Sequence, residues 1–263
     1  MTILTQVGGI IYLLTKPLAS KANKNIRNKL VQISTKLAVY FTIYLFACLL
    51  IVPLLAKRSG RIPLPLRSSK TFPAQPQTIF TCLMNRHYVR PQLKTAFQKI
   101  AQKFHRAYPT ISLNYLDANF PFLDGYPLLP HRSHDDGEKL DVGFIYKNQL
   151  NKQYQKKTPA FFGYGFCEEP KKKERDQISA CLDKGYWQYD LLKYFCFQKE
   201  DERFTFDETA NKKLLQLIAR EKSIRKIFIE PHLKTRLGLS GFQKIRFHGC
   251  KAVRHDDHIH FQL

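Results

Sequence analysis

Acidic residues are missing from the first 116 positions of this 263-residue chain, whose first carboxylate is Asp117. Those positions hold 17 Lys and Arg, so they supply +17 of the formal net charge of +22. The remaining 147 residues hold 26 basic and 21 acidic side chains and are nearly balanced. A folded nucleic-acid-binding domain usually carries its basic residues itself. The N-terminal excess instead indicates a membrane, or an anionic polymer close to one.

Two common zinc motifs are absent as well. No pair of cysteines has the C-x2-C spacing of a structural zinc site. No H-E-x-x-H sequence occurs, which excludes the usual metalloprotease helix. Cys48 lies in an apolar run, and the other five cysteines are an odd set that allows at most two disulfides: Cys82, Cys167, Cys181, Cys196 and Cys250. An oxidising compartment is therefore permitted but not required.

One long stretch, residues 37–56 (LAVYFTIYLFACLLIVPLLA), carries no charge. Twenty such residues in a helix span the core of a bilayer, and Pro53 is tolerated near the end of such a helix. The stretch is too long, and begins too far from Met1, for a cleavable signal peptide. The alternative is a buried helix of a soluble protein. Six basic residues precede the stretch and five follow it closely, so charge alone does not orient it.

The composition divides the chain into four parts. We expect a basic cytoplasmic segment at 1–36, a transmembrane helix at 37–56 and a proline-rich linker at 57–77. The linker is expected to be extended and to hold the following domain away from the membrane. Residues 78–263 are enough for one domain with its own hydrophobic core. No internal repeat is present, and oligomeric state is left open.

The domain shows patterns of both helix and strand. Helices are expected at 91–107, 208–221 and 231–239, and strands at 111–117, 139–146, 226–230 and the C-terminus. Strands and helices that do not alternate regularly predict an α+β fold. We expect a small antiparallel sheet with flanking helices and loops.

The last seven residues, DHIHFQL, contain His258 and His260, two positions apart. A strand repeats its facing every two residues, so both imidazoles would point to one face and Ile259 and Phe261 to the other. Two convergent imidazoles are typical of a metal site or an acid/base pair.

A partner motif lies upstream in HDDGEKLDV, where six residues separate His134 from Asp141. Gly137 allows a turn, which lets His134 lie on a loop beside the strand that carries Asp141. One imidazole, one carboxylate and one further imidazole from the final strand make three ligands. That number leaves a fourth tetrahedral position open, as in catalytic rather than structural zinc sites.

The two motifs, SHDDGEKLDV and RHDDHIHFQL, resemble those of the LAS peptidases, the group of lysostaphin-type enzymes, D-alanyl-D-alanine peptidases and Hedgehog domains. The greatest likeness is to the penicillin-insensitive murein endopeptidases, which show H-x(6,7)-D and, near the end of the domain, H-x-H. The likeness covers roughly residues 110–263. It implies zinc on His134, Asp141 and His260, with His258 as catalytic base. His255 matches a further histidine of the family and is expected to be a second catalytic residue, and His131 is a possible additional site residue.

Two features depart from the pattern of the family. Three acidic residues precede Asp141 within DDGE, where the family usually has smaller or neutral ones, and Gly143 stands where an acidic residue is frequent. His131 and His255 also have simpler interpretations, as a loop residue and as a surface residue. The remaining histidines are expected to be structural: His87, His105, His232 and His248. The acidic neighbours are expected to be solvated or to orient imidazoles: Asp135, Asp136, Asp256 and Asp257.

The resemblance implies a zinc peptidase that hydrolyses amide bonds in peptidoglycan peptides, as an endopeptidase or a carboxypeptidase. The apolar stretch would anchor it by a single pass in the cytoplasmic (inner) membrane, with the catalytic domain outside the cytoplasm. Two alternatives remain: a metal-dependent nuclease or phosphoesterase, and a non-catalytic wall-binding module of the same fold. The balanced charge of the C-terminal part argues against nucleic acid as a partner.

Overall fold

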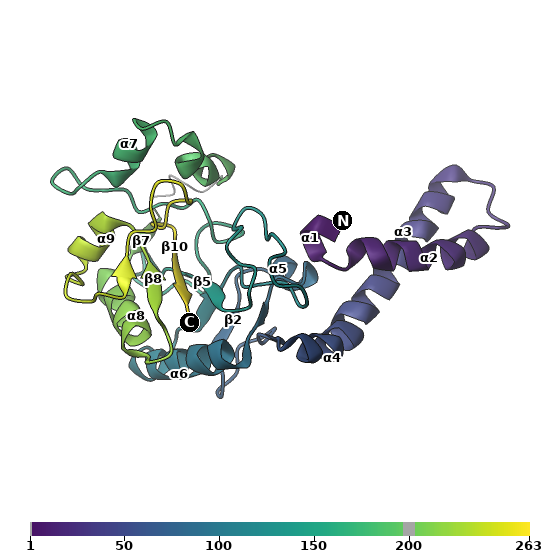
Figure 1. The fold of residues 1–263 in the computed structure, drawn as a ribbon, viewed down its shortest axis with the longest axis horizontal. Helices are drawn as coiled ribbons and strands as arrows, with labels where there is room; N and C mark the ends of the chain where they lie inside the picture. Colours follow the sequence, from purple (N-terminus) through teal and green to yellow (C-terminus); the bar gives the residue numbers. More distant parts are fainter. Residues whose placement is uncertain (1, 197–202) are drawn as a thin grey trace.

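A helical hairpin projects from a domain of helices and strands in the computed structural model, which describes residues 2–196 and 203–263 (Figure 1). The hairpin comprises α1 (Thr2–Thr5), α2 (Gly8–Ala22) and α3 (Lys29–Phe46). Beyond α3 the helix continues through a π-helical turn (Ala47–Ile51), α4 (Val52–Ala56) and a 3₁₀ turn (Lys57–Ser59). This continuous helix of 31 residues is long and apolar enough to cross a membrane. It extends beyond the predicted 37–56 at both ends.

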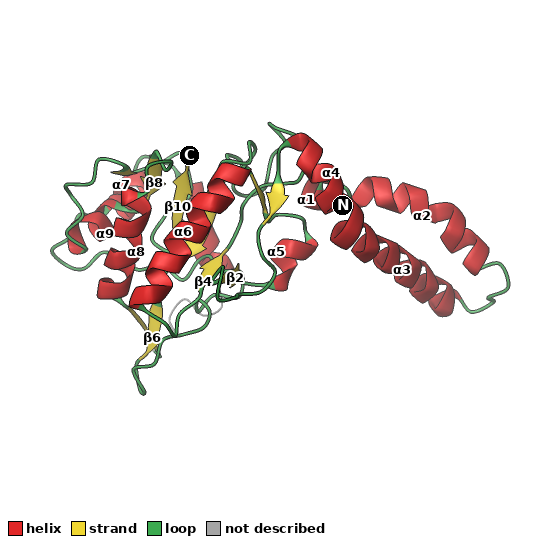
Figure 2. Cartoon of the chain, turned by 90° about the horizontal axis from the view of Figure 1, so that it is seen from below, coloured by secondary structure: helices red, strands yellow, loops and turns green. Residues whose placement is uncertain are grey.

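The sequence predicted that the first 36 residues form a separate segment beyond the span. In the structure they instead turn back along it (Figure 2). The rings of Tyr12 and Tyr40 lie 6.1 Å apart, and the Tyr40 hydroxyl donates to the Gly8 carbonyl. Asn28 begins α3 by accepting hydrogen bonds from two amides of the first turn, which is the usual role of an N-cap residue. The Phe122 amide donates to the Gln6 side chain at 2.8 Å, so the N-terminus returns to the domain.

The prediction of an extended linker at 57–77 is also wrong, because these residues are part of the folded domain. Strand β1 (Ile62–Pro63) pairs with β3 (Tyr88–Val89), and β2 (Ala74–Pro76) joins the main sheet. Proline is compatible with a strand at a sheet edge, where its missing N–H breaks no ladder. Arg61 is fully buried and donates to the carbonyl oxygens of loop residues around 120–135. The domain therefore begins near residue 61, not 78.

The main sheet has six strands in the order β2-β4-β5-β10-β8-β9. The additional strands are β4 (Leu113–Tyr115), β5 (Lys139–Gly143), β8 (Lys226–Phe228), β9 (Ile245–Arg246) and β10 (His258–Gln262). The inner pairs are antiparallel, as predicted, but the outer pairs β2–β4 and β8–β9 are parallel. Parallel pairs need a crossover, and α6 and α9 lie in these two connections. The α+β class is confirmed, and the sheet is mixed.

The predicted helices are present with small changes of length. They are α6 (Pro91–Ala107), α8 (Glu208–Arg220) and α9 (Pro231–Arg236), and two short helices join them: α5 (Ile79–Leu83) and α7 (Gln177–Leu182). The predicted strand 139–146 divides into β5 and β6 (Tyr146–Asn148), and β6 pairs with β7 (Phe204–Phe206).

One face of β10 lies in the hydrophobic core, and the other does not. Ile259 and Phe261 are fully buried in the main core, where Phe97 of α6 contacts Phe261. Because facing alternates along a strand, His258 and His260 lie on the opposite face. That face carries the candidate site.

Candidate metal centre

Strands β5 and β10 bring the two sequence motifs together. The antiparallel register places His260 opposite Asp141 and His258 opposite Gly143. Residues directly opposite on an antiparallel pair share a face, so Asp141 points to the same side as the two imidazoles. A Cβ at Gly143 would lie 2.2 Å from Cγ2 of Thr158. Thr158 therefore occupies the space that a side chain at position 143 would need.

His134 reaches the same place from a loop. The turn at Gly137 has φ +83°, a conformation that favours glycine. Nδ1 of His134 donates to the Ala118 carbonyl at 2.7 Å, which fixes the orientation of the ring. A carbonyl can only accept, so Nδ1 carries the proton and the lone pair of the neutral ring lies on Nε2. This lone pair faces Asp141 and His260.

Three ligand atoms form a nearly equilateral triangle. Nε2 of His134, Oδ1 of Asp141 and Nδ1 of His260 are separated by 2.9, 3.0 and 3.3 Å. A tetrahedral zinc ion with bonds of about 2.0–2.1 Å keeps its ligands roughly 3.3 Å apart. The triangle has nearly this size, and all three side chains are buried. The three ligand atoms are buried hydrogen-bond acceptors that face a common point. Such a group needs a proton or a cation between its members, so the three residues could hold a metal ion.

A second group of possible ligands shares Asp141 and adds His131 and His258. Here the contacts to Oδ2 of Asp141 are longer, at 3.6 Å from His131 and 3.8 Å from His258. The Tyr164 hydroxyl already donates to this oxygen at 2.8 Å. The His134 group therefore has the better geometry for an ion.

His131, which the sequence left open between a loop role and a site role, lies in the site. Its Nδ1 donates to Oδ2 of Asp117 at 3.0 Å, and Arg86 donates to the same oxygen at 2.7 Å. Burial acts to raise the pKa of Asp117, but the Arg86 charge and the His131 hydrogen bond outweigh it and lower the pKa. Asp117 is thus a carboxylate that orients the imidazole of His131.

His258 has the arrangement of a proton acceptor. Its Nδ1 donates to Asp257, and its buried Nε2 has no hydrogen-bond partner among the residues that the structure describes. Burial acts to lower the pKa of His258, but the charges of Asp257 and Asp141 outweigh it and raise the pKa to about 9. The Asp257 carboxylate is itself held by the Gly165 amide at 2.6 Å. Asp257 therefore orients the imidazole, as expected of an acidic neighbour.

His255 and His248 line the same region. The His255 ring lies 4.9 Å from that of His258, and burial together with its histidine neighbours holds the pKa of His255 well below its ordinary value. His248 was expected to be structural, but it stacks on Phe228 at 4.2 Å and lies 5.4 Å from His255. The sequence missed His248 because no spacing pattern connects its loop to β10.

The other expected structural histidines lie away from the ligand triangle. Nε2 of His232 donates to the Glu168 carbonyl, Nδ1 of His105 donates to the Ile111 carbonyl, and His87 is buried beside Tyr88. Tyr164 was also missed. It lies in FFGYGF, between two glycines of positive φ, and this short glycine-aromatic run was the one local signal of a special loop.

A buried ion network holds the segment before β10. Arg254 is only 1% exposed and pairs with Asp256, Asp190 and Glu169. Asp135 and Asp136 instead pair with Lys139 near the surface. A disulfide joins Cys181 of α7 to Cys250, within the predicted limit of two. These contacts fix the chain on both sides of His255.

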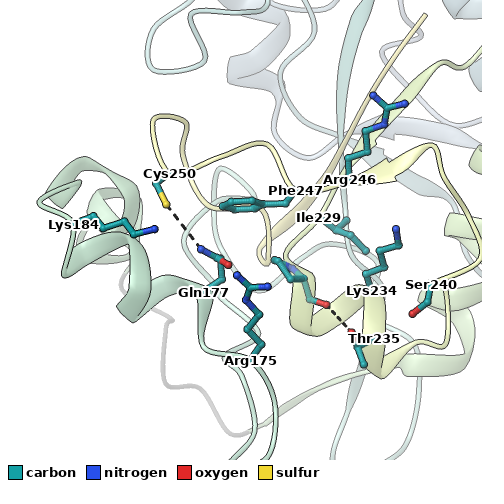
Figure 3. Close-up of a pocket in the computed structure, with 11 residues that line it drawn as sticks. Arg175, Gln177, Lys184, Ile229, Lys234, Thr235, Ser240, Arg246, Phe247 and Cys250 are labelled. Carbon is teal, nitrogen blue, oxygen red and sulfur yellow. Dashed lines mark hydrogen bonds between the residues drawn. The ribbon is translucent and has the colours of Figure 1, made fainter.

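A basic pocket of about 530 Å³ is lined by residues of α7, of α9 and of the chain around Phe247 and Cys250 (Figure 3). Four cationic residues line it and no carboxylate does: Arg175, Lys184, Lys234 and Arg246. Arg175 and Lys184 extend toward the buried Gln177, beside Phe247 (Figure 3). Within the described part of the chain, none of the four cations forms an ion pair. The pocket can accept an anionic group.

No protein family model matches the chain, and no curated protein matches its sequence.

Proposed function

We propose that this protein is a membrane-anchored zinc peptidase that hydrolyses amide bonds in peptidoglycan peptides. One observation carries the proposal: the triangle of His134, Asp141 and His260 lies beside His258, whose Nε2 has no hydrogen-bond partner among the described residues. Two nitrogens and one oxygen are a ligand set that zinc binds in catalytic sites. The motif resemblance points to the same residues.

The residues of the chain have separate roles in this proposal. Bound zinc would supply Lewis-acid chemistry, which polarises a carbonyl oxygen and lowers the pKa of water. Nε2 of His258 takes a proton from the attacking water as the new carbon–oxygen bond forms. The carbon–nitrogen bond then breaks, and His258 returns the proton to the leaving amine. Asp257 holds the imidazole of His258 in the tautomer that this exchange needs.

The basic pocket supports a substrate with carboxylates. Peptidoglycan peptides carry free carboxylates beside their amide bonds, and among the described residues no acid pairs with Arg175 or Arg246. His248, two positions after Arg246, lies 5.4 Å from the ring of His255. A peptide substrate would place one of its carboxylates in this pocket. Both an endopeptidase and a carboxypeptidase would use such a pocket.

The hairpin and the disulfide support a membrane location with the domain outside the cytoplasm. The helix of residues 29–59 has the length and composition of a span. The Cys181–Cys250 disulfide suits an oxidising compartment, because cytosolic thiols are usually kept reduced.

The test is metal analysis combined with digestion of purified peptidoglycan by the full chain in detergent. We expect about one zinc per chain, release of new amines, loss of hydrolysis on chelation and recovery with zinc. The His134→Ala variant is the matched control and should lack both zinc and hydrolysis. Full hydrolysis by verified metal-free protein would remove the proposal.

A nuclease or phosphoesterase is the second candidate, favoured by the same basic pocket, because phosphate also binds clustered cations. Cleavage of DNA or RNA by the zinc-loaded protein, together with strongly salt-dependent binding, would replace the peptidase by this activity. Peptidoglycan binding without zinc and without cleavage would identify a wall-binding module instead.

A further inference from the structure

The C-terminal turns of the apolar helix pack against the domain, although the rest of the helix projects away from it (Figure 1). The side chains at positions 44, 48, 52 and 56 repeat every four residues and are all buried. The Tyr44 hydroxyl donates to the Leu83 carbonyl, and the Asn85 amide contacts Sγ of Cys48 at 3.3 Å. A stripe with this spacing is one face of a helix. The domain therefore packs against the last three turns of the candidate span.

The opposite side of these same turns is open. Large apolar side chains remain exposed there at positions 45, 49, 50, 54 and 55. In a helix that crosses a bilayer, this side must lie in the hydrocarbon, because about twenty residues are needed to span it. The hydrocarbon of the bilayer then surrounds the exposed side of the same helical turns that the domain contacts.

An apolar patch on the domain continues this open side. An apolar cleft of about 390 Å³ is lined by Leu45 and Leu49 of the helix and by Leu66 and Ile79 of the domain. Next to Ile79, the ring of Phe80 lies 6.0 Å from Phe161 and 6.4 Å from Phe162. Phe161 and Phe162 are 57% and 52% exposed. Contiguous exposed residues of this size mark an interaction surface.

We infer that the domain docks on the lipid bilayer through this surface, which we call the aromatic patch: Leu66, Ile79, Phe80, Phe161 and Phe162. The patch is continuous with helix residues that the span places in lipid, so lipid covers both. Phenyl rings at this level would sit among the headgroups and the upper acyl chains. Arg67 and Lys70 follow Leu66 and suit the phosphates of the headgroups.

The patch also lies next to the candidate site in the chain. Phe161 and Phe162 are followed by Gly163, with φ +92°, and by Tyr164, whose hydroxyl donates to Asp141. A loop that inserts its phenyl rings in lipid while its tyrosine contacts Asp141 holds the site close to the membrane surface. This inference rests on the membrane anchor of the proposed function and is independent of the peptidase activity.

The experiment uses the single tryptophan of the chain. Trp187 is replaced by phenylalanine, and a new tryptophan is introduced at one position: Phe161→Trp, Phe80→Trp, or Leu150→Trp as the control. Leu150 is 85% exposed and follows β6, at the end of the domain away from the hairpin (Figure 2). The full chain is reconstituted in vesicles of phosphatidylcholine and phosphatidylglycerol, with or without brominated acyl chains.

Brominated lipid should roughly halve the emission of Phe161→Trp and Phe80→Trp, since interfacial side chains reach about 5–10 Å below the headgroups. Leu150→Trp should keep its emission and be quenched by aqueous iodide instead. Quenching of the Phe161→Trp and Phe80→Trp variants by iodide alone would overturn docking on lipid. Protection of both variants from iodide and from bromine would also overturn it, and would assign the patch to a second copy of the chain.

Discussion

At the scale of single residues, the site consists of imidazoles whose tautomers are set by acceptors. His134 donates to the Ala118 carbonyl, His131 to Asp117 and His258 to Asp257. In each ring the proton on Nδ1 leaves the lone pair of the neutral form on Nε2. Only the lone pair of His134 meets two other ligand atoms near 3 Å, whereas that of His258 stays free within the described part of the chain. The two histidines of β10 should therefore have different functions.

The first prediction separates these functions. His260→Ala should lose zinc and hydrolysis together, because the two remaining ligands hold the ion poorly. His258→Ala should keep near-normal zinc and lose about 10²–10⁴-fold in kcat, the usual share of a general base. Zinc content is measured beside the hydrolysis rate for each purified variant. The opposite pattern, with zinc retained by His260→Ala and released by His258→Ala, would reverse the assignment.

The second prediction concerns pH. His258 accepts a proton only when it is neutral, so activity should rise with pH through its pKa. The charge of Asp257 helps to raise that pKa to about 9 against the effect of burial. Asp257→Asn removes this charge and lowers the pKa, so the acidic limb of the kcat/KM profile should move to lower pH. The maximum rate should fall as well, because the base is weaker. The exposed Asp183→Asn serves as control, and an unmoved limb in Asp257→Asn would contradict the role of His258.

At the scale of elements, two central strands carry the site and a disulfide holds the elements beside it. β5 and β10 pair over five residues, and their register alone brings Asp141 to His260. The Cys181–Cys250 bond connects α7 to the loop before β10 across 69 positions of sequence. Closing a loop of that length lowers the conformational entropy of the unfolded chain, which stabilises the folded state by about 4 kcal/mol in the loop-entropy treatment.

The third prediction follows from this crosslink. The double variant Cys181→Ser/Cys250→Ser should lower the Tm of the full chain in detergent by roughly 10 °C. Hydrolysis should fall also, since Arg246, Phe247 and His248 shortly precede Cys250. Cys167→Ser, which changes a free cysteine, is the control and should leave Tm nearly unchanged. An equal Tm for the double variant and the parent would show that packing alone holds α7.

At the scale of the whole molecule, the helical hairpin determines the topology that the chain would have across a membrane. α2 returns along α3, so both Gln6 and the domain lie at one end and the basic tip lies at the other. The apolar part of α2 covers one side of α3, so in a membrane the chain crosses back beside the span and returns Gln6 to the side of the domain. The tip holds six Lys and Arg between positions 16 and 36, and it lies in the cytoplasm if the domain lies outside, as proposed.

The fourth prediction tests this topology by labelling with a thiol reagent that does not cross membranes. In a Cys167→Ser background, cysteines are introduced at Thr2, Asn25 and Leu150, one at a time. Thr2→Cys and Leu150→Cys should react from outside the cell, and Asn25→Cys only after the membrane is opened. Labelling of Asn25→Cys but not Thr2→Cys from outside would contradict the hairpin.

Local patterns in the sequence were sufficient for several elements and for residues that could hold a metal ion. The apolar spacing in α6 and α8 predicted both helices, because a helix brings residues three and four apart to one face. The period of two in DHIHFQL likewise predicted the facing of His258 and His260. The spacing of His134 and Asp141 predicted that a loop and a strand start would meet.

Contacts between distant segments could not be read in this way. The place of β2 in the sheet, the return of α2 along α3 and the Cys181–Cys250 bond join residues that no short period relates. Tyr164 and Asp117 enter the site for the same reason, since each is positioned by a hydrogen bond to a segment far away in the chain. Proline-rich composition even indicated a linker where an edge strand forms. Composition and periodicity describe the conformation of a segment, whereas the segment's neighbours follow from which surfaces can be buried together.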